Sequence, residues 1–293
     1  MATKLTFIGF GEAGGILASD LAQDHQVTVW DCKLEGQDRV AMLDKARQAG
    51  VRAAASLAEA LQDSALVFST VTAGAALDVA RQSAGLLDEG QLFLDLNSVA
   101  PETKRQASST FLPGAYVDVA VMAPVPPARL KTPLLIGGPQ AHQATAMLCR
   151  LGFNAQWGDE QVGKVSAIKM CRSVLIKGLE ALTAECLFAA RQYNVEQDVL
   201  ASLHASFPSL GWLDEFPGYL ISRVAQHGIR RSEEMEEVVK TLRDVGSQAY
   251  MSQSTVQAQR YLPQQMAERG LFYHPEDTFD WQKLADELTA GSV

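Results

Sequence analysis

The stretch KLTFIGFGEAGG at residues 4–15 decides how the first half of the chain folds. It places a G-x-G-x-x-G motif between a short apolar strand and a helical stretch, ILASDLAQ, that follows directly. In that setting we expect Gly9 to allow a tight turn, Gly11 to let a pyrophosphate approach the backbone, and Gly14 to let the helix pack closely on the strand. The first turn of the helix would then face the phosphates of a dinucleotide.

An acidic residue stands where such a fold binds the adenine ribose. Twenty-two residues after Gly9, the strand VTVW ends in Asp31, whose carboxylate would accept hydrogen bonds from the ribose hydroxyls. NAD is therefore the expected cofactor. NADP is disfavoured rather than excluded, because its 2′-phosphate would meet like charge at Asp31, which Lys33 partly offsets. A surface role for Glu12 is as reasonable as a cofactor contact, and a purely structural glycine-rich turn is the alternative for the whole motif.

Polar residues also follow a later strand-like run, LFLD. Asn97 and Ser98 come where α/β sheets bind ligands, beyond the carboxyl end of a strand. A strand-to-helix cap before Pro101 explains them nearly as well. The predicted cofactor-binding residues are Gly9, Phe10, Gly11, Glu12, Ala13, Gly14, Asp31, Thr70, Val71, Asn97 and Ser98.

The pattern downstream of the motif divides the chain into an α/β half and a helical half. Up to about residue 158, apolar runs alternate with helical segments, which is typical of a mostly parallel sheet covered on both faces. These runs are LTFIGF, VTVWD, ALVFSTV, LFLDLNS, YVDVAVM and TPLLIGG. Strand signals then stop, and a 30-residue stretch without proline predicts one long helix. We therefore expect a Rossmann domain at residues 1–160 and an all-helical substrate and dimerisation domain at 161–293. Its further helices are predicted at 195–205, 217–227, 232–245 and 252–269.

Composition restricts the partners and the location. The 293 residues carry a formal charge of -9 without a basic cluster, so nucleic acid and anionic membranes are poor partners. No apolar run approaches the roughly 18 residues of a membrane helix, and a cytoplasmic location is expected. The scattered histidines suggest no metal site. Reduced, mostly buried thiols are expected at Cys32, Cys149, Cys171 and Cys186.

Three further segments accompany GFGEAGG in the order of a known family. They are DLNSVAP at 95–101, residues 118–124, and the start of the long helix, where Gly163 lies six residues before Lys169. Together they resemble the β-hydroxyacid dehydrogenase family, which includes 3-hydroxyisobutyrate and 6-phosphogluconate dehydrogenases, over nearly the full chain. The family motifs are D-x-S-T-x-x-P and G-x-G-x-x-x-K-x-x-N-N. The resemblance implies that Lys169 is the catalytic acid or base and that the long helix carries it into an interdomain cleft.

The departures from the family concentrate on the substrate side. Its two asparagines after the lysine are Arg172 and Ser173 here, and its Ser-Gly-Gly substrate loop is Met122-Ala123-Pro124. The usual family substrate is therefore not expected. An uncharacterised oxidoreductase branch of the family, with R-S after the lysine and H-x-x-R-R further on, is a better match, because residues 227–231 read HGIRR.

The long helix also points to an anion site without the family. Lys169, Arg172, Ser173 and Lys177 recur at i, i+3, i+4 and i+8, which places them on one helix face. Partial burial beside Arg172 would lower the pKa of Lys169 toward that of a general base. The planar guanidinium of Arg172 suits a carboxylate. An ordinary solvated stripe is the alternative.

A second pair of cations is predicted to lie in a turn. Gly228 is expected to end one helix and Ser232 to cap the next, which leaves Arg230 and Arg231 between them. Two exposed arginines in a turn need no function, so a structural role and a substrate contact are equally reasonable.

These features predict an NAD-linked oxidoreductase that transfers a hydride between nicotinamide and a small anionic hydroxy acid or its oxo counterpart. Lys169 would move the proton. An imine reductase and a cofactor-binding module without catalysis stay as alternatives. A homodimer through the helical domain is expected from its apolar and aromatic content. The predicted substrate-binding residues are Met122, Ala123, Arg172, Ser173, Lys177, Arg230 and Arg231.

Overall fold

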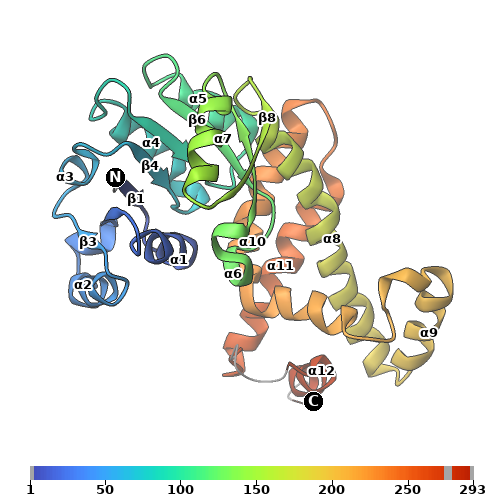
Figure 1. Cartoon of the computed structure of the whole chain (residues 1–293). Coiled ribbons are helices and arrows are strands. Elements are labelled where there is room, and N and C mark those ends of the chain that lie inside the picture. The colour runs from blue at the N-terminus through green and yellow to red at the C-terminus, as the bar shows by residue number, and fades with distance from the viewer. Residues whose placement is uncertain (1–2, 274–278, 291–293) are drawn as a thin grey trace. The chain divides into compact units, whose positions relative to one another are not determined.

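The computed structural model describes residues 3–273 and 279–290, and the chain divides into two compact units (Figure 1). Unit 1 is Met1–Met170 and unit 2 is Cys171–Val293. The division falls inside a long helix, α8 (Lys164–Gln192), rather than at residue 160, where the sequence placed the domain boundary.

Unit 1 is built on an eight-stranded sheet with the order β3-β2-β1-β4-β5-β6-β7-β8. Every neighbouring pair is parallel except β6 and β7, which confirms the expected Rossmann-type α/β class. The strands are β1 (Lys4–Ile8), β2 (Gln26–Trp30), β3 (Arg52–Ala53), β4 (Leu66–Ser69), β5 (Leu92–Asp95), β6 (Tyr116–Val121), β7 (Pro133–Gly137) and β8 (Asn154–Asp159). The sequence predicted neither β3 nor β8, because β3 has two residues and the edge strand β8 has no continuous apolar run.

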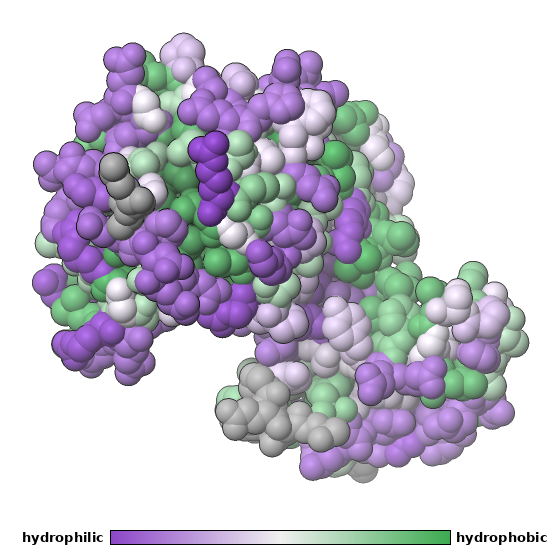
Figure 2. All heavy atoms as spheres, viewed as in Figure 1, coloured by the Kyte–Doolittle hydropathy of each residue, from purple (hydrophilic) through white to green (hydrophobic). Residues whose placement is uncertain are grey.

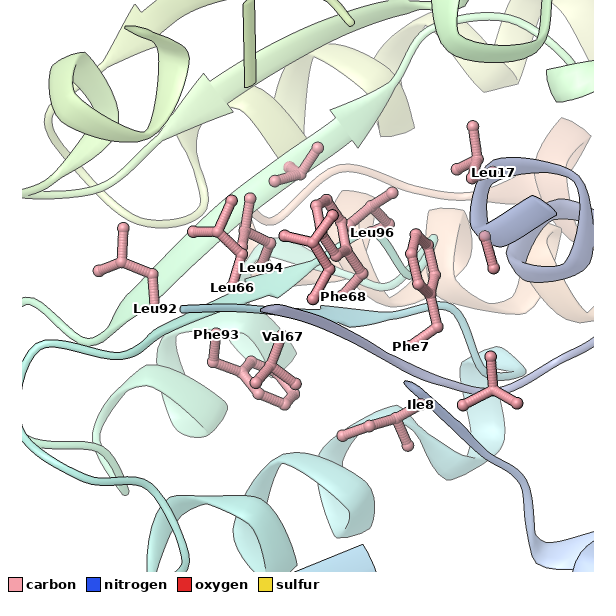
Figure 3. Packing of buried hydrophobic residues seen from close by; sticks show 14 of the residues in the cluster. Phe7, Ile8, Leu17, Leu66, Val67, Phe68, Leu92, Phe93, Leu94 and Leu96 are labelled. Carbon is pink, nitrogen blue, oxygen red and sulfur yellow. The ribbon is translucent and has the colours of Figure 1, made fainter. Parts of the chain in front are cut away.

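The central strands bury side chains on both faces. Figure 3 shows Phe7 and Phe68 on one side of the sheet and Ile8, Val67 and Phe93 on the other. The rings of Phe7 and Phe68 stack with their centroids 4.6 Å apart. Helices therefore cover both faces of the sheet, as the uninterrupted apolar runs predict. The α-helices of unit 1 before α8 are α1 (Glu12–Leu21), α2 (Arg39–Gln48), α3 (Leu57–Leu61), α4 (Ala76–Ala84), α5 (Pro101–Ser108), α6 (Val125–Ala128) and α7 (Ala141–Arg150).

Unit 2 is helical throughout its described part. It takes the greater part of the 29-residue α8, which the sequence predicted, and it includes one helix, α12, that the sequence did not predict. Its own core forms around Leu187, Trp212, Ile221, Val224 and Trp281. The remaining helices are α9 (Glu196–Ser206), α10 (Phe216–Asp244), α11 (Tyr250–Glu268) and α12 (Trp281–Thr289).

A single helix, α10, replaces the two helices expected at 217–227 and 232–245. A Cβ on Gly228 would lie 2.1 Å from the backbone oxygen of Gln259 and 2.7 Å from Cγ of Pro263, both on α11. Gly228 therefore allows α10 to pack closely on α11 and does not end a helix. Ser232 is not an N-cap, because its hydroxyl donates to the backbone oxygen of Ile229 one turn earlier, at 2.7 Å. The predicted turn was wrong because an isolated glycine marks close packing as readily as a helix end.

This packing gives a first testable prediction. We expect Gly228→Ala to lower the free energy of unfolding by about 1–3 kcal/mol, because the added methyl group overpacks the contact between α10 and α11. The loss should appear although alanine is the better helix former by about 1 kcal/mol. Gly178→Ala in α8 is the matched control, since its Cβ would lie 3.9 Å from the nearest atom, Oγ1 of Thr255.

The measurement is urea denaturation of both variants followed by circular dichroism. The control should be at least as stable as the wild type. A Gly228→Ala protein as stable as that control would show that α10 and α11 separate without cost, which contradicts the packing role.

All four cysteines are free and exposed, which corrects the expected burial of the thiols. That expectation used the average preference of the residue type, whereas each of these side chains lies on the solvent side of its helix or turn. Within the described residues, no helix combines the length and the apolar character that crossing a membrane requires.

Candidate functional site

The glycine motif forms the loop between β1 and α1. Gly9 has a φ of +90°, and a Cβ there would lie 2.6 Å from the backbone oxygen of Thr70. A Cβ on Gly14 would lie 2.2 Å from the backbone oxygen of Gly9. At Gly11, in contrast, no heavy atom of the described chain comes within 4 Å of an added Cβ. Gly9 and Gly14 therefore satisfy the chain's own packing, whereas Gly11 leaves open space at the amino end of α1, where a pyrophosphate fits.

Asp31 holds this loop from the end of β2. Its Oδ2 accepts a hydrogen bond from the backbone N–H of Phe10 at 2.8 Å, and its Oδ1 accepts one from the backbone N–H of Lys33 at 3.0 Å. A carboxylate has about four lone-pair positions, so acceptor capacity is left for a ribose hydroxyl. The side chain of Glu12 is exposed.

Lys45 of α2 is a second clamp on the loop, and sequence reasoning missed it. Its Nζ donates to the backbone oxygens of Phe10 at 2.5 Å and Gly11 at 2.9 Å, and it lies 4.7 Å from the centre of the Phe10 ring. Partial burial lowers the pKa of Lys45, while the nearby Asp31 carboxylate opposes that shift. No sequence motif marks this lysine, because only the fold brings α2 to the loop.

The other candidate residues of unit 1 follow neighbouring strands at the same edge of the sheet. Thr70 follows β4, Asn97 follows β5 and Met122 follows β6, and these strands run parallel to β1 in the order β1-β4-β5-β6. Their carboxyl ends therefore meet at the edge where α/β sheets bind ligands. Thr70 also donates through Oγ1 to the backbone oxygen of Gly9 at 2.7 Å, which ties β4 to the glycine loop. Val71 is half-buried there, as are Met122 and Ala123.

Asn97 is buried with one polar atom unused. Its Nδ2 donates to Oγ of Ser69 at 2.9 Å, and its backbone N–H donates to Oδ1 of Asp95 at 2.9 Å. Its Oδ1 has no hydrogen-bond partner among the described residues. A buried carbonyl oxygen without a partner is costly, so this atom suits a ligand that donates a hydrogen bond, as a cofactor ribose does. The open backbone at Gly11 and this acceptor both fit a dinucleotide.

Lys169 contacts the residue after Asn97. Its Nζ donates to Oγ of Ser98 at 2.5 Å, although 71 positions separate the two residues in the sequence. Lys169 is half-buried in the part of α8 that belongs to unit 1. The structure thus brings the candidate acid or base to the carboxyl edge of the sheet, next to the candidate cofactor residues.

A buried ion cluster lies behind this contact, and sequence reasoning missed its centre. Lys104 of α5 has no exposed surface, and its Nζ lies 3.0 Å from Oδ1 of Asp95 and 3.4 Å from Oδ1 of Asp118. The hydroxyl of Tyr116 donates to Oδ2 of Asp95 at 2.6 Å. Burial and the two carboxylates raise the pKa of Tyr116 well above its usual range, so the phenol stays a donor. The available signal was two aspartates within apolar strands, because buried carboxylates need a cation.

The same cluster fixes the start of α8. Oδ2 of Asp118 accepts a hydrogen bond from the backbone N–H of Gly163 at 2.9 Å, and Oδ1 accepts one from Oγ of Ser166 at 2.6 Å. Gly163 has a φ of +93°, and a Cβ there would lie 3.1 Å from the backbone oxygen of Pro101. Asp118 therefore connects β6 to the helix turn that precedes Lys169.

In unit 2 three of the four predicted cations pair with carboxylates, and two of the four are exposed. Lys177 is buried, and its Nζ lies 2.5 Å from Oε2 of Glu234, which also pairs with Arg230. Arg231 is buried and binds Glu180 through two contacts of 2.6 and 2.7 Å. This corrects the expectation of two exposed arginines, because only Arg230 is exposed. Ser173 is buried and Arg172 is exposed, and within the described residues neither side chain forms a hydrogen bond with this cluster.

Comparison with known sequences gives a family match in each unit. Residues 4–152 match the model of the NAD binding domain of 6-phosphogluconate dehydrogenase, and residues 190–262 match a domain of unknown function. An uncharacterised 28.5 kDa protein of Methanothermus fervidus is 28% identical over 240 residues, which cover 81% of this chain and 90% of that protein.

Solved structures of similar fold cover nearly the whole chain. A conserved hypothetical protein from Sinorhizobium meliloti is 33% identical, with a TM-score of 0.74 and coverage of 98% of this chain and 96% of that one. A conserved protein described as structurally similar to 3-hydroxyacid dehydrogenases is 32% identical, with a TM-score of 0.70 and coverage of 89% and 97%. A 3-hydroxyisobutyrate dehydrogenase from Mycobacterium tuberculosis has a TM-score of 0.72 at 14% identity over 99% of this chain and 100% of that one, which shows the shared fold.

Proposed function

Because the chain belongs to the family defined by the NAD binding domain of 6-phosphogluconate dehydrogenase, we propose that it is an NAD(P)-dependent oxidoreductase acting on a small hydroxy acid or its oxo counterpart. The observation that carries the proposal is the hydrogen bond from Lys169 Nζ to Ser98 Oγ, beside the unused buried acceptor of Asn97. A proton-transfer group thus stands beside a candidate dinucleotide contact, as hydride transfer to or from a carbon–oxygen bond requires.

The proposed mechanism divides the chemistry between cofactor and chain. A bound nicotinamide supplies or accepts the hydride. In oxidation Lys169 takes the hydroxyl proton at Nζ, and in reduction it donates a proton from Nζ to the developing alkoxide. Ser98 holds Nζ in place through its hydroxyl, and the buried cluster around Lys104 positions the helix that carries Lys169.

The proposed substrate contacts include all the residues predicted from the sequence, and their environments differ. Arg172 has an exposed guanidinium group that can bind a substrate carboxylate, and it is the proposed anchor. Arg230 is also exposed, but it already pairs with Glu234. Lys177 and Arg231 are buried and pair with Glu234 and Glu180. These carboxylates hold the two cations in place. Met122, Ala123 and Ser173 complete the proposed set.

The cofactor preference provides the direct test of the dinucleotide site. We expect NADH to bind more tightly than NADPH, because a 2′-phosphate would approach the carboxylate of Asp31. Asp31→Asn keeps the size of the side chain and an acceptor for the Phe10 N–H but removes the charge. It should therefore lower the ratio of NADH affinity to NADPH affinity by about tenfold. Asp38→Asn is the matched control, since Asp38 is exposed in the same segment and its side chain makes no capping bond.

Fluorescence titration of both cofactors checks this prediction. Equal or higher affinity of the wild type for NADPH would show that Lys33 and Lys45 outweigh Asp31. A screen of hydroxy acids, oxo acids and imines with the preferred cofactor then tests the reaction. Turnover of imines alone would replace the hydroxy acid assignment, and cofactor binding without any turnover would leave a binding module.

The homodimer stays a prediction, and the surface of unit 2 favours it. Large hydrophobic side chains are exposed there, for example Leu175 at 72% and Tyr193 at 80%. Figure 2 shows hydrophobic residues gathered over α8 and α9. Burial of such a surface is the usual driving force for association of identical chains.

A further inference from the structure

One stretch of α10 carries more positive charge than its surroundings neutralise. Arg223, His227, Arg230 and Arg231 lie at i, i+4, i+7 and i+8, so one broad face of the helix carries them. They act on each other electrostatically, because Arg223 and Arg230 both influence the titration of His227 and of Arg231. Arg223 and His227 are half-buried and Arg230 is exposed, so solvent reaches this group of residues. We call these four residues the α10 basic group.

The carboxylates nearby do not balance these cations. Lys177 of α8 adds a fourth positive charge to those of the three arginines. Within residues 3–273 and 279–290, two carboxylates pair with these cations: Glu234, which pairs with Lys177 and Arg230, and Glu180, which pairs with Arg231. Four cations against two anions leave two positive charges, in a chain whose net charge is -9.

Donor atoms in the group also lack acceptors. The Nε atoms of Arg223 and Arg231 are buried and have no hydrogen-bond partner among the described residues. Arg223 makes no ion pair in residues 3–273 and 279–290, and its NH1 donates a long hydrogen bond of 3.4 Å to Oε1 of Gln226. The Glu180 carboxylate interacts electrostatically with Arg223 but forms no ion pair with it, so an arriving anion would complete the surroundings of this half-buried guanidinium.

His227 contributes a neutral donor. Burial and the three arginines lower its pKa to about 4, so the imidazole is uncharged near neutral pH. One ring nitrogen of a neutral imidazole still carries a hydrogen to donate. His227 therefore adds a hydrogen-bond donor without adding charge.

We propose that Arg223, His227 and Arg230 bind a doubly negative tetrahedral anion, the phosphate or phosphonate group of the substrate, with Arg231 and Lys177 behind them. A dianion matches the surplus of two charges, whereas a single carboxylate would neutralise only half of it. Its three oxygens can accept from two guanidinium forks and one imidazole N–H. The assignment to a substrate group rests on the proposed oxidoreductase function; the anion site itself does not.

The test is titration of the full chain with inorganic phosphate, methylphosphonate and acetate at pH 8 and constant ionic strength. Binding is read from the NMR resonance of the His227 ring, assigned with His227→Asn, and from calorimetry. Each titration is run with and without saturating NADH, because the glycine loop at Gly11 is also a phosphate site. We expect both dianions to shift the His227 resonance and to bind at least about tenfold more tightly than acetate.

Variants connect the signal to the proposed residues. Arg223→Gln should weaken phosphate binding by about tenfold or more, the usual effect of losing one charged hydrogen-bonding partner. Arg243→Gln, which removes an exposed arginine near the end of the same helix, should leave it unchanged. Thermal melts check that both variants fold. If a variant does not fold, the titration of the wild-type chain still tests the proposal.

Several outcomes would overturn the proposal. They are no response of His227 to either dianion, equal affinity for acetate, or equal losses in the Arg223 and Arg243 variants. Binding of phosphate with rejection of methylphosphonate would overturn the assignment to a substrate group, since the ligand would then be free phosphate. If His227 responds to both dianions but NADH does not bind, the oxidoreductase proposal fails and the anion site stands.

Discussion

Replacing Lys169 with methionine should lower kcat by a factor of about 10² to 10⁴, the usual contribution of a general acid or base. The loss should fall on kcat rather than on KM alone, because the proton moves only in the chemical step. Methionine keeps the length and the helix propensity of lysine, so folding and NADH affinity should survive. The pH profile of kcat should lose one ionisation.

The structure supplies the controls for this measurement. Lys164→Met removes an exposed lysine from the first turn of the same helix, and its kcat should stay at the wild-type value. Ser98→Ala removes the hydroxyl that accepts the bond from Nζ, so it should lower kcat less than Lys169→Met and keep the ionisation. Steady-state turnover of an active oxo or hydroxy acid across pH measures all three. A Lys169→Met variant with most of the wild-type kcat and an unaltered pH profile would assign the proton transfer to another group or to water, and the proposed role of Lys169 would be wrong.

The features that the sequence predicts well are those set by local backbone needs. The backbone at position 9 needs a positive φ, and position 14 has no room for a side chain. Glycine is therefore needed at both positions, and their spacing can be recognised in the sequence alone. Continuous apolar runs such as that of β4 likewise follow from burial on both faces. The parallel sheet, the long α8 and the NAD-binding class were therefore accessible from the sequence.

The features that the sequence predicts poorly depend on segments that meet only in the folded chain. Lys45 reaches the glycine loop from α2, and Lys104 reaches two strands from α5. Both resemble ordinary surface lysines in the sequence, because nothing local distinguishes a buried cation from a solvated one. Gly228 shows the opposite error. A glycine in a helical stretch is typical of a helix end, but this glycine is needed for the contact between α10 and α11.

The same distinction explains the two arginines of α10. Once the helix continues through Gly228, Arg230 and Arg231 point in different directions around its axis, about 100° apart. Arg231 is therefore buried against Glu180, while Arg230 stays exposed beside Glu234. A turn would have exposed both arginines. The burial of Arg231 was therefore missed because the helix was predicted to end at Gly228.

Replacing Lys104 with methionine should lower the free energy of unfolding of unit 1 by about 3–5 kcal/mol, the cost of removing one partner from a buried ion cluster. The side chain is fully buried between Asp95 and Asp118, so the variant leaves two carboxylates close together without a cation. Water cannot reach them to compensate. Methionine fills a similar volume, so a cavity contributes little to the loss.

Lys4→Met is the matched control, because Lys4 pairs with Asp63 on the surface, where the side chains are 52% and 67% exposed. Such a pair is worth about 1 kcal/mol or less. Denaturant unfolding of both variants gives the comparison. Adding Asp118→Asn to Lys104→Met should recover part of the loss, since one unpaired charge is removed while the amide can still accept the Gly163 N–H. If Lys104→Met costs no more than Lys4→Met, the cluster does not stabilise the sheet, and the connection from Asp118 to the start of α8 must rest on the hydrogen bonds of Gly163 and Ser166 alone.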